Sequence, residues 1–179
     1  MNSTFSTDST VNASPLQLDS ALTAKVLVLG DVLREKKWTV SSAESCTGGG
    51  VAFAFTSVSG SSDWFNQSWV TYSNEAKQRE LGVTEATLSQ YGAVSEQTVK
   101  EMAQGVCRKS GAELAVTVSG IAGPGGGSDE KPVGTVWFGF ACGDKTAQIK
   151  QVFSGNRDQV RSAAIAFAIS HLVKMLGEK

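Results

Sequence analysis

The sequence predicts a single-domain α/β sandwich whose mixed parallel and antiparallel sheet is flanked by helices. Segments with helical periodicity alternate with strand-like segments along most of the chain, which is typical of a sheet covered by helices. The last two strands are separated only by a turn around Gly143 and Asp144, which favours an antiparallel hairpin. The 179 residues, 41% of them hydrophobic, suffice for one buried core but not for two ordinary domains.

The first half of the chain predicts three helices and two strands. The expected elements are a helix over 16–37, a strand over 38–41, a helix over 51–55, a strand over 68–72 and a short helix after Ser73. Apolar residues at helical spacing predict the first helix, with Pro15 suited to its first turn. β-branched and aromatic residues favour the strands. Ser73 is a good cap for the short helix, and Gly82 ends it.

The second half predicts two helices and three strands. The expected elements are a helix from Ser95 to Lys109, strands over 114–119, 134–141 and 147–153, and a helix over 158–176. Ser95 is a cap residue with Thr98 at the third helical position, and Gly111 lies just beyond the helix as a breaker. The strand over 114–119 is nearly all apolar or β-branched, which indicates a buried position.

Residues 1–14 are expected to be a disordered polar tail, and residues 15–179 to be the folded domain. The tail is rich in Ser, Thr and Asn, and it lacks the basic and apolar regions of a signal peptide. No run of residues approaches the roughly 18 uninterrupted apolar positions of a membrane-spanning helix. We therefore expect a cytoplasmic protein without membrane contact.

Composition argues against several classes of function. The chain has 16 Lys and Arg against 17 Asp and Glu, so it lacks the diffuse basic surface of non-specific nucleic-acid binding. Cys46, Cys107 and Cys142 are far apart with no C-x-x-C spacing, which argues against a disulfide framework and fits a reducing cytosol. With a single histidine, scattered cysteines and no carboxylate pair at a recognised spacing, we expect no metal site and no cofactor.

The first candidate site is the glycine-rich turn over 44–50. Small residues between a strand and a helix would expose backbone N–H groups, which can hold an anion or an oxyanion. Ser45 is a candidate nucleophile, Thr47 a candidate ligand contact and Cys46 a second possible nucleophile. The alternative is purely structural, with a hydroxyl that caps a helix and glycines that allow close packing. The turn matches neither the P-loop nor the nucleophile-elbow spacing.

Serine chemistry needs a base, and the segment over 71–77 offers one. The single histidine, His171, is embedded among apolar residues of the last helix, and we interpret it as structural. A lysine whose pKa is lowered by burial can act instead, so Lys77 is the candidate, and Tyr72 could relay its proton. The alternative is that Lys77 pairs with a glutamate on an exposed helix face.

Two further features suit ligand contacts. The glycine-rich loop over 119–132 would let the main chain approach a ligand closely, although its charged residues are typical of any solvated loop. Arg157 at the start of the last helix could receive a phosphate. The alternative for Arg157 is a surface network with Asp158.

Several motifs, at consistent separations, resemble the CinA C-terminal family. They are Ala43-Glu44-Ser45-Cys46-Thr47-Gly48-Gly49, Gly60 to Phe65, Val70 to Lys77, Gly92 to Glu96, Ser119 to Pro124, Gly127-Ser128 and Lys131 to Val136. The resemblance extends from about Leu16 to Leu176. The best-understood activity of the CinA C-terminal family is deamidation of nicotinamide mononucleotide to nicotinic acid mononucleotide and ammonia, within pyridine-nucleotide recycling.

The resemblance implies a serine amidohydrolase that binds a small-molecule nucleotide and forms a homo-oligomer. Ser45 matches the nucleophile, and Tyr72 and Lys77 match its catalytic partners. The residues expected to bind the substrate are Thr47, Gly48, Gly49, Asn74, Gly120, Ile121, Ala122, Gly123 and Arg157. In the implied mechanism Lys77, helped by Tyr72, takes the Ser45 proton, while turn or loop N–H groups stabilise the oxyanion.

Other functions stay open at this point. Larger members of the family carry an N-terminal domain linked to pyrophosphatase activity, for which this chain has no room, so we expect that activity to be absent. A non-catalytic nucleotide-binding or interaction module of the same family, linked to competence and DNA damage, is the main alternative. A peptidase-like or acyl-transfer enzyme acting on another amide is a third, and nicotinamide riboside is a further possible substrate.

Overall fold

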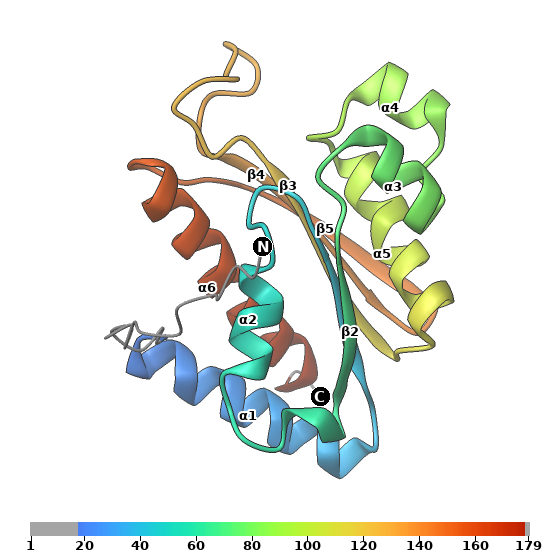
Figure 1. Cartoon of the computed structure of the whole chain (residues 1–179), viewed down its shortest axis with the longest axis vertical. Coiled ribbons are helices and arrows are strands. Elements are labelled where there is room, and N and C mark those ends of the chain that lie inside the picture. The colour runs from blue at the N-terminus through green and yellow to red at the C-terminus, as the bar shows by residue number, and fades with distance from the viewer. Residues whose placement is uncertain (1–17, 178–179) are drawn as a thin grey trace, which may run out of the picture.

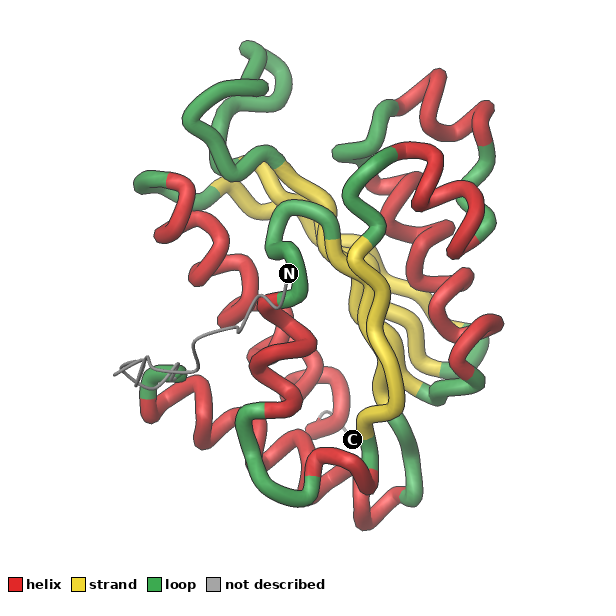
Figure 2. The backbone as a smooth tube through the Cα atoms, in the orientation of Figure 1, coloured by secondary structure: helices red, strands yellow, loops and turns green. Residues whose placement is uncertain are grey.

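The computed structural model describes residues 18–177, in which a five-stranded mixed sheet forms the centre of the molecule (Figures 1 and 2). In spatial order the strands are β2 (Phe65–Val70), β1 (Val40–Glu44), β3 (Leu114–Gly120), β4 (Thr135–Cys142) and β5 (Lys145–Val152). β1 is parallel to both of its neighbours, whereas the β3–β4 and β4–β5 pairs are antiparallel. The mixed sheet and the hairpin predicted from the sequence are confirmed.

Helices cover both faces of the sheet, as Figure 1 shows. One layer contains α1 (Ser20–Lys36), α2 (Gly50–Thr56) and α6 (Arg157–Gly177), and the other contains α3 (Asn74–Leu81), α4 (Glu85–Tyr91) and α5 (Glu96–Ser110). A short 3-10 helix, Ser61–Asp63, precedes β2. Each face has its own hydrophobic core, and both cores include residues of the sheet. The predicted α/β sandwich with flanking helices is therefore confirmed.

Burial along the strands follows their place in the sheet. Every residue of β1 and all but the last residue of β3 are buried, because both strands have neighbours on each side and helices on each face. The edge strands β2 and β5 contain no fully buried residue. α6 is long and apolar enough to cross a membrane by length and composition alone. Its packing on α1, α2, β3 and β4 makes it a structural helix of this domain.

Helix boundaries follow the caps expected from the sequence at several points. The Ser73 side chain accepts a hydrogen bond from the Ala76 amide, and the Ser95 side chain accepts one from the Thr98 amide. Gly82 and Gly111 follow α3 and α5 in the left-handed region, where glycine is favoured. These short polar contacts satisfy helix-end amides that would otherwise lack partners.

Some predicted boundaries were wrong. The first helix begins at Ser20, because the Asp19 carboxylate caps it through the Leu22 amide. Leu16 and Pro15 lie outside the described residues, as does the predicted tail over 1–14. The first strand runs over 40–44 instead of 38–41, because pairing with β2 and β3 continues through polar residues. The second runs over 65–70 instead of 68–72, and α4 was not predicted at all.

Four segments meet at one end of the sheet and create the site. β1, β2 and β3 are parallel and therefore end at the same edge. The turn before α2 follows β1, α3 follows β2, and the loop over 121–134 follows β3. β5 also ends there, so that α6 begins beside them (Figure 1). The topology thus gathers the predicted site segments at the carboxyl edge of the sheet, where open α/β sheets bind ligands.

Candidate active site

Glu44, the last residue of β1, organises the glycine-rich turn. Its side chain is completely buried, and its carboxylate accepts hydrogen bonds from the amides of Gly49, Val51 and Ala52 at 2.9 to 3.1 Å. Gly49 has φ +96°, a conformation that residues with a side chain rarely adopt. The turn therefore folds back on the carboxylate that precedes it, which joins the end of β1 to the start of α2.

Ser45 lies between Glu44 and this turn, at the carboxyl end of β1. Its amide donates to the carbonyl oxygen of Val118 in β3 at 2.9 Å. The residue is half-buried, and its Oγ lies 3.3 Å from the Nζ of Lys77. The predicted serine and lysine, 32 positions apart in sequence, thus meet in space.

Lys77 in α3 is almost completely buried, with 1% of its surface exposed. Besides Ser45 Oγ, its Nζ approaches the carbonyl oxygens of Thr71 at 2.8 Å and Tyr72 at 3.5 Å. Burial lowers the pKa of Lys77, because the charged ammonium loses its hydration. None of the ion pairs among residues 18–177 involves Lys77, so the surface glutamate pairing considered from the sequence is not found in that range.

Cys46, the second possible nucleophile, is in an unfavourable environment for a thiolate. Burial, together with the nearby Glu44 charge, raises the pKa of its thiol to about 11. The thiolate is the reactive form of cysteine, so Cys46 remains a protonated thiol at neutral pH. These observations favour Ser45 over Cys46 as the nucleophile.

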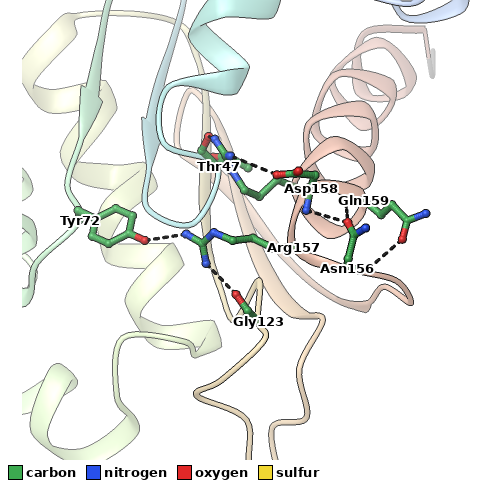
Figure 3. Close-up of polar contacts among 8 residues, drawn as sticks. Thr47, Tyr72, Gly123, Asn156, Arg157, Asp158 and Gln159 are labelled. Carbon is green, nitrogen blue, oxygen red and sulfur yellow. Dashed lines mark hydrogen bonds and ion pairs between the residues drawn. The ribbon is translucent and has the colours of Figure 1, made fainter.

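Arg157 joins three of the segments at the mouth of the site (Figure 3). Its Nη2 donates to the Tyr72 hydroxyl at 3.1 Å and its Nη1 to the Gly123 carbonyl oxygen at 2.9 Å. Tyr72 is 61% exposed. The Tyr72 hydroxyl contacts Arg157, whereas the Tyr72 backbone carbonyl oxygen is the atom that contacts Lys77. The Asn156 side chain accepts from the amides of Asp158 and Gln159 at the start of α6. The Arg157–Asp158 network considered from the sequence is not among the ion pairs of residues 18–177, where Asp158 lies near Arg161 instead.

Arg161, one helical turn further along α6, was not predicted as a site residue. Its Nη2 donates to the carbonyl oxygen of Thr47 at 3.0 Å, and its Nη1 lies 4.0 Å from the Asp158 carboxylate. The hydroxyls of Thr47 and Thr71 are buried and lack hydrogen-bond partners in the described part of the chain. They are further polar groups at this edge of the sheet. Arg161 lies four positions after Arg157, so both face the same side of α6, and this spacing was the sequence signal that could have indicated Arg161.

The remaining predicted binding residues lie around this centre without converging on one point. Gly48 is exposed and Gly49 half-buried in the turn, and Asn74 is exposed at the first position of α3. Gly120 pairs with Val136 at the end of β3, and the Ile121 amide donates to Thr135. Ala122 and Gly123 are buried beside them. The base of the glycine loop is thus bonded to β4, whereas residues 124–130 are exposed.

His171 lies in the other half of α6, away from Ser45. Its ring packs against Phe140 and Phe167, with centroid distances of 4.4 and 5.9 Å. Across residues 18–177 no three His, Cys, Asp or Glu side chains are grouped as a metal site would require. Ser45 and Lys77 come together with the lysine buried, whereas the contact of Lys25 with Ser170 lies on the exposed surface.

Fold and site together define a class: an α/β sandwich with a serine–lysine pair at the carboxyl edge of its parallel strands. A profile of the CinA C-terminal domain matches residues 22–176, and the chain belongs to this family. A relative described as nicotinamide-nucleotide amidohydrolase PncC from Enterobacter agglomerans is 59% identical over 79% of this chain and 87% of its own. Its namesake from Escherichia coli K12 is 52% identical over 86% and 94%.

Solved structures agree with this assignment. The competence/damage inducible protein CihA from Agrobacterium tumefaciens superposes with a TM-score of 0.88 at 37% identity, covering 92% of this chain and all of that one. The competence damage-inducible protein A from Klebsiella pneumoniae gives 0.85 at 35% identity, covering 88% and 98%. The family resemblance predicted from the motifs is confirmed, and so is the fold.

Proposed function

We propose that this chain is an amidohydrolase that converts nicotinamide mononucleotide into nicotinic acid mononucleotide and ammonia, with Ser45 as the nucleophile and Lys77 as the base. The observation that carries the chemistry is the 3.3 Å contact between Ser45 Oγ and a buried lysine of lowered pKa. The substrate is proposed from the amidohydrolase relatives, which are 48 to 59% identical over most of their length.

The three contacts of Lys77 suit the neutral amine that a base requires. A neutral amine has two N–H groups, which match the carbonyl oxygens of Thr71 and Tyr72, and one lone pair, which matches the Ser45 hydroxyl. The carbonyl contacts therefore orient the lone pair toward the proton that must be removed. General-base catalysis requires a base close to the proton that it removes, and burial lowers the pKa of Lys77 in the direction of the working pH.

The reaction would proceed through an acyl-enzyme. Ser45 Oγ attacks the carboxamide carbon while its proton passes to Lys77 Nζ, and the carbonyl π electrons move to oxygen. As the intermediate collapses, the C–N bond breaks and the leaving nitrogen takes the proton from Lys77, so that ammonia departs. Water then attacks the ester with Lys77 as base, the bond to Ser45 Oγ breaks, and the serine regains its proton. Backbone amides of the turn or loop would stabilise the oxyanion in both halves.

Tyr72 and Arg157 border this centre and are proposed to serve the substrate jointly. Tyr72 contacts Lys77 through its backbone carbonyl and Arg157 through its hydroxyl, and it is proposed to help carry protons toward the leaving nitrogen once substrate is bound. Arg157 uses two of its five N–H groups in the contacts described, so others remain for a phosphate, together with amides of the glycine loop. Binding the phosphate at a distance would orient the carboxamide over Ser45. No cofactor enters this scheme.

The setting of the enzyme belongs to the same proposal. We propose a cytoplasmic homo-oligomer, as the family resemblance implies. Free Cys46, Cys107 and Cys142 support a reducing compartment. Size-exclusion chromatography with light scattering would measure the oligomeric state, and a monomeric mass at micromolar concentration would contradict that part of the proposal.

The direct test incubates the purified chain with nicotinamide mononucleotide and follows ammonia and nicotinic acid mononucleotide together. We expect both products in equal amounts, with and without a chelator, and a clear preference over nicotinamide riboside. No product above the uncatalysed background would contradict the proposed function. Loss of activity with the chelator would contradict the proposed chemistry, in which no metal takes part.

A further inference from the structure

The backbone amides of the Ser45 turn divide into a bonded set and a free pair. The bonded ones are Ser45 N to Val118 O, Gly48 N to Ser45 O, Gly50 N to Thr47 O, and the amides of Gly49, Val51 and Ala52 to the Glu44 carboxylate. In the described part of the chain the amides of Cys46 and Thr47 donate to no backbone or side-chain oxygen, and the Cys46 amide faces its own thiol. Of the consecutive amides over 45–52, these two lack an oxygen acceptor within the described residues.

The free pair follows the nucleophile directly. The bond from the Gly48 amide to the Ser45 carbonyl oxygen closes a four-residue turn at 3.0 Å, with Cys46 and Thr47 at its centre. Central amides of such a turn lie outside its closing hydrogen bond. Two preorganised donors next to a nucleophile are the usual means of stabilising a tetrahedral oxyanion. The Cys46 and Thr47 amides hold this position directly after Ser45.

Glu44 decides which amides are left over. The amides of Gly49, Val51 and Ala52 belong to the start of α2 and would otherwise be unsatisfied donors that attract the same negative charge. Glu44 accepts from all three with a fully buried carboxylate, which also ties the start of α2 to the end of β1. We propose that Glu44 is a positioning residue of the hydrolytic site, which leaves the Cys46 and Thr47 amides as the oxyanion donors.

A second contact holds the far end of the same turn. Arg161 Nη2 donates to the Thr47 carbonyl oxygen at 3.0 Å, and that oxygen also accepts from the Gly50 amide. The turn is thus anchored before Ser45 by Glu44 and after Thr47 by α6. This inference rests on the proposed function, because an oxyanion forms only if Ser45 attacks a carbonyl group.

The test compares Glu44→Gln with the wild-type enzyme on nicotinamide mononucleotide. The amide has the size of the carboxylate but only one acceptor oxygen, so at least one α2 amide loses its partner and the turn loosens. We expect kcat to fall by about 30-fold, less than the roughly 10²- to 10³-fold loss that follows outright removal of an oxyanion donor, with KM changed less than about twofold. Inhibition by the 3-carbaldehyde analogue of the substrate, which forms a tetrahedral adduct with serine, should weaken by a similar factor.

Glu113→Gln is the matched control. Its carboxylate also accepts a backbone amide, from Thr39 at 2.7 Å, but it lies before β3 at the opposite end of the sheet. We expect Glu113→Gln to retain wild-type kcat and aldehyde inhibition. If Glu44→Gln does not accumulate as folded protein, Arg161→Met takes its place, with the same expected pattern of lowered kcat and retained KM.

The outcomes separate this inference from the proposed function. A wild-type enzyme that releases no ammonia overturns the function itself. An active, Ser45-dependent wild type with unchanged kcat in folded Glu44→Gln, or in Arg161→Met where that variant is used, overturns only the role of the turn. The role of the turn is also overturned if KM rises by the same factor as kcat falls, or if the affinity for the product nicotinic acid mononucleotide falls by that factor. Either pattern indicates general damage to the substrate-binding site.

Discussion

Two glycine-rich segments lie at the same edge of the sheet, and they are built in opposite ways. In the turn over 44–50, glycines with positive φ allow the chain to fold around a buried carboxylate, and the amides of Ser45, Gly48, Gly49 and Gly50 donate to protein oxygens. In the loop over 121–134 the base is bonded to β4, whereas residues 124–130 are exposed. Glycine content alone therefore does not distinguish a rigid reaction centre from a loop that approaches the substrate. The buried Glu44 carboxylate next to the turn distinguishes the two segments.

The largest expected effect lies at the nucleophile. Ser45→Ala should lower kcat/KM for nicotinamide mononucleotide by at least about 10³-fold, because it removes the hydroxyl that contacts the buried lysine and is proposed to form the acyl-enzyme. Cys46→Ala should stay within about threefold of wild type, since its thiol is buried and protonated. A coupled ammonia assay measures both variants. Full activity in Ser45→Ala, or a loss confined to Cys46→Ala, would show that Ser45 Oγ is not the nucleophile.

Lys77→Met comes next, with an expected loss of about 10³-fold in kcat, because Ser45 would lack a base. In the wild type, kcat/KM should rise with pH as Lys77 loses its proton, and the rise should have its midpoint below the usual pKa range of lysine. Lys25→Met, which removes an exposed lysine bonded to Ser170, should leave this profile unchanged. An acidic limb that persists in the residual activity of Lys77→Met would show that another group titrates.

Stability offers an independent view of the same lysine. Burial lowers the pKa of Lys77, so the unfolded chain binds more protons than the folded one between the folded pKa and about 10.4. The penalty is fully present below the folded pKa and is relieved as pH rises. Thermal unfolding of wild type and Lys77→Met at pH 6 and 9 should therefore show the wild type gaining relative to the variant at pH 9. A constant difference would argue against a depressed pKa.

A smaller effect is expected where the two glycine-rich segments are joined through α6. Arg157→Ala releases both the Tyr72 hydroxyl and the Gly123 carbonyl oxygen. We expect an increase of about tenfold in KM for the mononucleotide and a reduced preference over the riboside, because charge-assisted contacts to a phosphate are lost. Steady-state kinetics on both substrates measure this. An unchanged preference would remove Arg157 from phosphate recognition and leave it as a link between segments.

The smallest effects compare glycines in the two segments. Gly49→Ala forces a side chain into φ +96° and should cost about 1–2 kcal/mol of unfolding free energy. Gly125→Ala should change stability by less than about 0.5 kcal/mol, since an added Cβ there meets no atom within 4 Å. Urea denaturation of both variants gives the two values. Equal costs would contradict the contrast between a fixed turn and an exposed loop.

Local patterns were enough to predict much of the fold. Helical spacing, the Ser73 and Ser95 caps and the Gly143–Asp144 hairpin act over a few residues, so the sequence displays them directly. α4 was missed because only Thr87 and Leu88 of its seven residues are buried, which leaves little apolar periodicity. The polar strand β1 was placed too early, because its burial results from neighbours that lie far away in the sequence.

The site was predictable in its residues but not in its geometry. Ser45 and Lys77 were candidates by chemical type, yet their contact depends on two parallel strands ending side by side. Tyr72 and Arg157 are 85 positions apart, and no local pattern connects them. Glu44 was seen only as part of a motif, because a charged residue at a strand end is usually solvated. In the structure its side chain is buried, and its carboxylate accepts hydrogen bonds from three backbone amides.

The most direct measurement of the serine–lysine account uses hydroxylamine as a competing nucleophile during hydrolysis of nicotinamide mononucleotide. An acyl-enzyme on Ser45 predicts that hydroxamate forms in place of nicotinic acid mononucleotide, in a ratio that rises linearly with hydroxylamine concentration, and that Ser45→Ala forms neither product. Ammonia release by the wild type with no hydroxamate at any concentration would show direct attack by water and contradict the account.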